Sequence, residues 1–140
     1  MPMKTLFMGL VAALLVAGLG VTNAEADDAK KSDPCCDECK ACEKSCLACA
    51  DACLTELAGG KADRKNCIKL CQDCADICGT CAKIAARNGP LEATIAAACA
   101  DACEKCAAEC EKHKDDKTCQ ACAEQCKKCA KECKEQAKKK

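Results

Sequence analysis

The chain has 140 residues, enough for one small domain, and its 22 basic and 22 acidic side chains balance. This balance gives no argument for nucleic acid or an anionic membrane surface as a partner. Half of the residues are hydrophobic, but Cys and Ala supply most of them, and only nine Leu and Ile follow residue 26. A domain of this size normally buries a larger apolar core, so thiols, or something bound to them, must hold the interior together.

The first 26 residues have the pattern of a secretory signal peptide. Lys4 is followed by an apolar run from Leu6 to Val21, and small residues precede two candidate cleavage positions, Ala24 and Ala26. An uncleaved membrane anchor is the alternative, although the run is short for a span. We therefore expect an exported protein, periplasmic or extracellular, whose mature form is soluble and has no membrane segment.

Residues 27–33 are polar and are expected to be disordered, whereas 34–140 carry helix signals. Asp33 and Pro34 are typical of a helix N-cap and first position, and Gly59-Gly60 and Asn88-Gly89 are typical of helix ends. Four helices are predicted, over 34–58, 63–87, 90–113 and 116–138. Short connections between them favour an all-α fold, an antiparallel up-down four-helix bundle.

Cysteine recurs on each predicted helix at alternating spacings of three and four residues, which is the period of one helix face. Such a face normally carries leucine in a bundle, so the sequence predicts a core lined with thiols. The four stripes are Cys39, Cys42, Cys46, Cys49 and Cys53; Cys67, Cys71, Cys74, Cys78 and Cys81; Cys99, Cys103, Cys106 and Cys110; and Cys119, Cys122, Cys126, Cys129 and Cys133.

Antiparallel helices would bring these cysteines into levels of four, and the third stripe is one cysteine short. Cys35 keeps the register of the first stripe, while Cys36 lies about 100° round the helix and is the weakest candidate for a core position. The expected end levels are Cys53 with Cys67, Cys110 and Cys119, and Cys39 with Cys81, Cys99 and Cys133.

Two interpretations of the 21 cysteines fit poorly. A disulfide-stabilised structural or interaction module suits an exported chain, but the count is odd, and neighbours on one helix face are too far apart for a relaxed disulfide. An iron–sulfur protein is suggested by the run Cys36-x2-Cys39-x2-Cys42-x3-Cys46. Leu47, however, replaces the proline of that motif, and a cluster loop would interrupt the first helix.

Two further interpretations keep the bundle but change its chemistry. Levels of four thiolates could bind zinc, although a structural zinc site usually occurs once in a small domain. A thiol oxidoreductase is suggested by Cys-x2-Cys pairs, but no βαβ pattern accompanies them, and one redox couple needs far fewer cysteines. We therefore expect a binding protein and not an enzyme.

Cu(I) suits this ligand set best, because soft thiolates select it and it accepts only two or three of them. Two private thiolates per ion would give about ten ions and one buried negative charge at each site, which is costly. Thiolates that bridge neighbouring ions would neutralise the core and raise the capacity to about twenty. Charge therefore favours high-capacity storage and buffering of Cu(I).

The repeated Cys-x2-Cys-x3-Cys stripe on four helices resembles the bacterial copper storage proteins over essentially the whole mature chain. The resemblance implies Cu(I) held by paired and bridging thiolates along the bundle axis, with the stripe cysteines as ligands, and a homotetramer. That family has cytosolic and exported members, and the leader sequence places this chain with the exported ones.

One residue other than cysteine is a candidate ligand. His113 falls three residues after Cys110, so it would continue the third stripe and meet incoming copper first. Alternatively, it is a solvated residue between Lys112 and Lys114 at the end of a helix.

Overall fold

The computed structural model describes residues 33–139, and within this range the chain forms four α-helices and no strand. The elements are α1 (Pro34–Ala58), the 3-10 turn η1 (Ala62–Arg64), α2 (Lys65–Ala86), α3 (Glu92–Cys110) and α4 (Lys117–Lys138). The predicted signal peptide and residues 27–32 lie outside the described residues. None of the described helices is long and apolar enough to cross a membrane.

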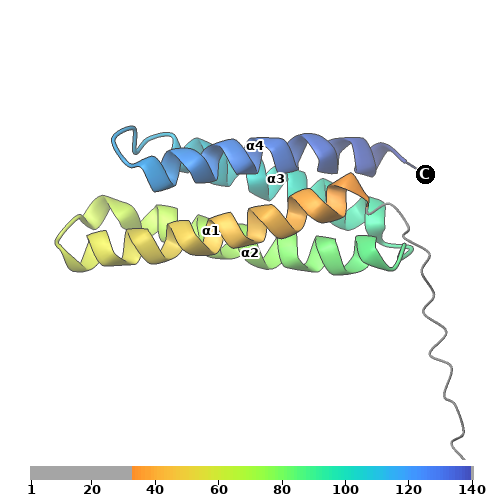
Figure 1. Cartoon of the computed structure of the whole chain (residues 1–140), viewed down its shortest axis with the longest axis horizontal. Coiled ribbons are helices and arrows are strands. Elements are labelled where there is room, and N and C mark those ends of the chain that lie inside the picture. Colours follow the sequence, from red (N-terminus) through yellow and green to blue (C-terminus); the bar gives the residue numbers. More distant parts are fainter. Residues whose placement is uncertain (1–32, 140) are drawn as a thin grey trace, which may run out of the picture.

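The helices lie side by side along their length and run alternately up and down (Figure 1). α1 packs against α2 and α4, and α3 packs against the same two neighbours. The helices that follow one another in the chain are therefore adjacent in space, as short connections require. This arrangement confirms the predicted all-α four-helix bundle.

Side-chain caps and glycine define the limits of α1. The Asp33 carboxylate accepts a hydrogen bond from the Cys35 backbone N–H at 2.8 Å, and Pro34 occupies the first helical position. At the other end, α1 stops at Ala58. Gly60 then adopts a φ of 99°, in the left-handed region that glycine enters without steric cost.

A tight turn replaces the expected start of the second helix at residue 63. Arg64 donates its backbone N–H to the Lys61 carbonyl at 3.3 Å, and α2 begins only at Lys65. No side chain caps this start, so the shorter i→i+3 hydrogen bond satisfies the backbone instead. The turn directs Arg64 inward, where it is 6% exposed.

The third helix is shorter at both ends than the expected range 90–113. Pro90 lies in a turn closed by a 3.0 Å hydrogen bond from Glu92 N–H to the Gly89 carbonyl. After Cys110 the chain tightens again, because His113 donates its N–H to the Cys110 carbonyl at 3.1 Å, an i→i+3 bond. His113 therefore does not continue the helical stripe, contrary to the prediction.

Small side chains fill the interior. Every described cysteine is at most 3% exposed, and alanines surround them; Ile68 is the one buried Leu or Ile in 33–139. These small side chains let the helices lie close together. At one such close approach, Glu43 of α1 lies against Gly79 of α2, where an added Cβ would be 2.7 Å from Glu43 Oε1. Ala96, fully buried three residues before Cys99, occupies the place of the missing cysteine in the third stripe.

Candidate metal centre

The sulfur atoms form one continuous column along the bundle axis. All twenty-one cysteines are buried as free thiols, and twenty of them lie 3.5–4.0 Å from at least one other Sγ. We call these twenty the thiol column. Because each helix contributes its stripe to the same axis, the column follows directly from the predicted periodicity.

The expected level at one end is present in the structure. Cys53 Sγ lies 3.6 Å from Cys67 Sγ and 3.7 Å from Cys119 Sγ, and Cys67 Sγ lies 3.8 Å from Cys110 Sγ. These four residues come from four different helices. Their sulfurs mark the end of the column beside η1.

The other end differs in detail from the expected level. Cys39 Sγ lies 3.7 Å from Cys99 Sγ and 3.5 Å from Cys133 Sγ, as expected. Cys81 Sγ, however, contacts Cys35 Sγ at 3.9 Å, and Cys35 in turn lies 3.5 Å from Cys133. Cys35 therefore extends the column by one step beyond the predicted level.

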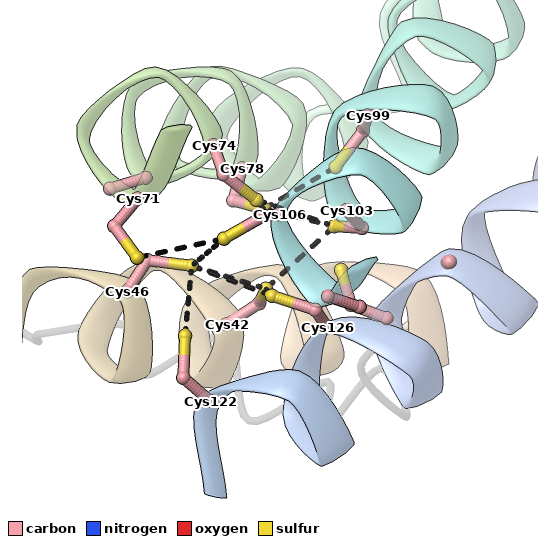
Figure 2. Close-up of a cluster of buried hydrophobic side chains, with 14 of the residues drawn as sticks. Cys42, Cys46, Cys71, Cys74, Cys78, Cys99, Cys103, Cys106, Cys122 and Cys126 are labelled. Carbon is pink, nitrogen blue, oxygen red and sulfur yellow. Dashed lines mark hydrogen bonds between the residues drawn. The ribbon is translucent and has the colours of Figure 1, made fainter. Parts of the chain in front are cut away.

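In the middle of the column, single sulfurs are shared among several neighbours (Figure 2). Cys46 Sγ lies 3.9 Å from Cys42, 4.0 Å from Cys106, 3.6 Å from Cys126 and 3.8 Å from Cys122. These partners come from three helices. A sulfur in this position can act as a ligand to more than one metal ion.

The four-sulfur groups that could hold a metal ion overlap along the column. Cys42, for example, belongs both to a group with Cys74, Cys78 and Cys103 and to one with Cys46, Cys74 and Cys126, and within each group the sulfurs lie within 4.8 Å of one another. A tetrahedral zinc site at about 2.3 Å per bond would also place its sulfurs roughly 3.8 Å apart, so spacing alone does not exclude zinc. Overlapping groups such as these two cannot both hold a zinc ion with four sulfurs of its own, whereas sulfurs that bridge two ions can serve both groups.

Two other interpretations fail on this geometry. A disulfide requires sulfurs about 2.05 Å apart, and no described pair is closer than 3.5 Å. The run that resembles a ferredoxin motif, from Cys36 to Cys46, lies inside the unbroken helix α1 and forms no cluster loop.

Cys36 is buried but stands outside the column. Its Sγ donates to the Ala82 carbonyl at 3.5 Å, and that oxygen is its hydrogen-bond partner in the described structure. The 100° rotation from Cys35 explains this, since adjacent helical residues cannot share one narrow face.

Burial raises the pKa of the column thiols, whereas contacts between thiols raise the pKa of some and lower that of others, such as Cys35 and Cys106. Burial, reinforced by Cys67, raises the pKa of Cys53 to about 11. At the column centre, contacts with Cys106, Cys122 and the other neighbouring thiols raise the pKa of Cys46 further. A metal ion that binds such thiols must therefore displace their protons. Its positive charge then stabilises the buried thiolates, which water does not reach.

Polar side chains gather where the column ends beside η1. His113 has a side chain only 7% exposed, so the alternative interpretation, a solvated residue at the end of a helix, does not hold. Its Nδ1 lies 3.7 Å from Asp63 Oδ2, and its Nε2 is buried without a hydrogen-bond partner. His113 lies beyond the end of α3, but the turn after Cys110 brings its side chain back into a buried position.

Arg64 is a component of this site that sequence reasoning did not identify as functional. Its Nη1 lies 3.6 Å from Cys119 Sγ, at the end of the thiol column. A signal was present, because Arg64 precedes Cys67 by three residues and so shares the register of the second stripe. The residue type concealed it, since arginine is normally assigned to the surface.

Comparison with known proteins supplies the family. The sequence profile of the copper storage protein family matches residues 28–138. The chain belongs to the copper storage protein family. A search of curated proteins gives no match.

Solved copper storage proteins share the sequence and the fold. Cu(I)-bound Csp3 of Bacillus subtilis is 40% identical, with a TM-score of 0.71 over 76% of this chain and 97% of that one. The Streptomyces lividans protein loaded with ten copper equivalents is 37% identical, with a TM-score of 0.68 over 74% of this chain and 80% of that one.

The comparison contradicts the prediction of an exported protein. The copper storage protein of Streptomyces lividans, 37% identical over 74% of this chain, is cytosolic. The apolar run at residues 6–21, on which the prediction depended, lies outside the described residues and outside the matched range 28–138. A short apolar run does not by itself establish export.

Proposed function

We propose that the chain stores Cu(I) inside its bundle, with the twenty cysteines of the thiol column as ligands. The observation that carries this proposal is the sharing of sulfurs, of which Cys46 with four sulfur neighbours is the clearest case. Shared thiolates can bridge adjacent ions, so the charge of the thiolates and that of the Cu(I) ions approach balance in the buried core. Such an arrangement lets one chain bind many Cu(I) ions, and the chain acts as a binding protein.

Anaerobic titration of the reduced, copper-free protein with Cu(I), against a competing chelator, tests this proposal. Bridging predicts saturation at about twenty ions per chain. Saturation at about four or five ions, with zinc competing effectively, would establish separate four-thiolate sites and remove the storage proposal.

His113 is proposed as the outermost ligand of the store. Support comes from its buried Nε2, which has no partner, while Nδ1 faces Asp63. A neutral imidazole with Nδ1 protonated presents the lone pair of Nε2 to a metal ion. His113→Ala should slow loading from a weak Cu(I) chelator several-fold, and loading at the wild-type rate would contradict this role.

The protein is also proposed to form a homo-oligomer, as the resemblance to copper storage proteins implies. Leu47 and Leu54 of α1 are 52% and 46% exposed and lie seven residues apart, on one outward helix face. Light scattering should give a mass of several chains, reduced by Leu47→Glu. A monomeric wild type would refute the assembly.

A further inference from the structure

Arg64 is a charged group placed where the bundle interior ends. Its side chain is 7% exposed, and its guanidinium Nη2 lies 2.6 Å from Glu56 Oε2 and 3.4 Å from Asp116 Oδ2. Burial opposes the charge of the guanidinium, but the carboxylates of Glu56 and Asp116 offset this cost. A permanent positive charge is therefore fixed at this position.

The contacts of Arg64 connect the end of α1, the turn η1 and the start of α4. Arg64 itself lies in η1, Glu56 in the last part of α1, and Asp116 is the N-cap of α4. The Cys119 sulfur, to which Nη1 donates at 3.6 Å, is the first thiol of α4 and also contacts Cys53. The guanidinium thus connects α1 to α4 and contacts the first sulfur of α4 at the end of the thiol column.

Ion pairs hold the Arg64 guanidinium at the end of the column, while its hydrogen bonding is incomplete. The Nε atom of Arg64 is buried and has no partner. The carboxylates of Glu56 in α1 and Asp116 at the start of α4 hold the guanidinium in place, so moving it outward means separating both ion pairs. The Arg64 side chain can therefore move outward to open this end of the column. Because its buried Nε has no partner to lose, the free-energy cost of that movement is lower than for a fully hydrogen-bonded guanidinium.

The opposite end of the column is covered differently. Gln136 follows Cys133 by three residues, is 7% exposed, donates to Glu92 and accepts a hydrogen bond from Lys139. The covering side chain there is a neutral amide. At the η1 end, by contrast, a buried cation, the Arg64 guanidinium, directly contacts a sulfur at the end of the column.

We propose that Arg64 is a latch that limits the rate at which Cu(I) enters and leaves the thiol column, without being a ligand. A cation approaching the sulfurs of Cys53 and Cys119 meets both the bulk and the positive charge of the guanidinium, and it passes only when the ion pairs to Glu56 and Asp116 separate. Arg64 therefore controls exchange rates and leaves capacity unchanged. This inference depends on the proposed storage function.

Arg64→Gln tests the latch, because glutamine removes the charge and adds no soft metal ligand. The matched control is Arg87→Gln, at the other end of α2, where the exposed Arg87 side chain donates to the Lys83 carbonyl. Each protein is saturated anaerobically with Cu(I) and mixed with excess of a chelator that forms a coloured Cu(I) complex. Loading from a weaker chelator complex gives the rate in the other direction.

We expect Arg64→Gln to accelerate both loading and release by about tenfold or more at an unchanged copper number, while Arg87→Gln behaves as wild type. A lower copper number or weaker binding in Arg64→Gln would instead make Arg64 a counter-ion of bound copper and overturn the latch. Unchanged rates, or equal acceleration by both variants, would overturn it as well. A low copper number in the wild type would refute storage itself and is measured separately.

Asp116→Asn keeps the inference testable if Arg64→Gln fails to fold. Asparagine retains the N-cap oxygen that accepts from Thr118 and Cys119, but it removes one of the two charges holding Arg64. A smaller acceleration than in Arg64→Gln, in both directions and at full copper number, is expected. Wild-type rates in Asp116→Asn would count against the latch.

Discussion

At the scale of single residues, cysteine does two things in this protein that are usually separated. It fills the core as a small apolar side chain, and in the proposed function it also supplies the ligands for Cu(I). The position in the column decides how many neighbours a sulfur has, from one contact for Cys81 to four for Cys46. We therefore expect the number of Cu(I) ions that each thiolate contacts to vary along the thiol column.

A comparison of Cys46 with Cys36 tests this grading. Cys46→Ala removes a sulfur with four neighbours, so we expect it to lower the copper number by about two ions and to weaken the binding of adjacent ions. Cys36→Ala removes a buried cysteine of the same helix that contacts no other sulfur, and the copper number should stay as in the wild type. Equal losses in the two variants would show that buried cysteine content alone, and not the column, determines capacity.

At the scale of the helices, the caps and turns decide which polar groups meet the column. Asp116 caps α4 with one oxygen, which accepts from Thr118 and Cys119 N–H at 2.9 and 3.0 Å, and holds Arg64 with the other at 3.4 Å. Burial works against ionisation of this carboxylate, but the hydrogen bonds from Cys119 and Thr118 and the charge of Arg64 lower its pKa. The same residue thus starts a helix and positions the latch.

This depressed pKa predicts the sign of a pH effect on stability. The stabilisation by ionised Asp116 is present above the ordinary carboxyl pKa of about 3.9 and is lost as pH falls through the lower value in the folded protein. Asp116→Asn should therefore reduce the free energy of unfolding by about 1 kcal/mol at pH 7 and by less near pH 3. Denaturant unfolding of the reduced, copper-free protein, followed by circular dichroism, measures both values.

The neighbouring Asp115 is exposed and provides the control for this pH effect. Asp115→Asn should leave the unfolding free energy nearly unchanged at both pH values, since no buried partner depends on its charge. If Asp116→Asn and Asp115→Asn gave the same pH dependence, the special role of the cap would be refuted.

The sequence predicted the helices and the inward stripe because both depend on local periodicity. It placed Cys53, Cys67, Cys110 and Cys119 at one level correctly, since antiparallel helices with short connections leave little freedom in alignment. The sharing of sulfurs could not be predicted, because it depends on the stagger and spacing of four helices at the scale of an ångström. The copper-storage interpretation is confirmed by the family of the chain.

The polar end of the column was the least predictable part. Arg64 reaches the interior through a 3-10 turn, and His113 reaches it through a turn after α3, where the sequence indicated continuous helix. Turns of this kind arise from hydrogen bonding at helix ends and have no periodic signature. The turn after α3 therefore moved His113 out of the expected helix face, whereas Arg64 kept the register of the second stripe and was hidden by its residue type.

At the scale of the whole molecule, the interior combines many small side chains with few large apolar ones. Cysteine and alanine bury less area per residue than leucine, so the copper-free bundle obtains a modest hydrophobic contribution for its size. Anything that binds only the folded state adds its binding free energy to stability. Copper content and stability should therefore be coupled.

Thermal unfolding at increasing copper content measures this coupling. Each added portion of Cu(I) is expected to raise the melting temperature, and at free copper about 100 times the dissociation constant one site alone adds about 2.7 kcal/mol. Removal of the metal with a strong chelator should restore the original value, which excludes irreversible oxidation as the cause. A melting temperature independent of copper would mean that the metal binds outside the folded interior.

The fully buried Ala96 stands on the third stripe, where a cysteine would complete the pattern. Its backbone is already helical, and replacing a methyl hydrogen with a thiol adds a single heavy atom beside Cys99 and its neighbours. The holding capacity of this architecture can therefore grow or shrink through individual codon changes, without inventing a new fold or a new site. Natural variation along such a stripe would adjust the size of a metal reserve much as repeat number adjusts the length of a solenoid.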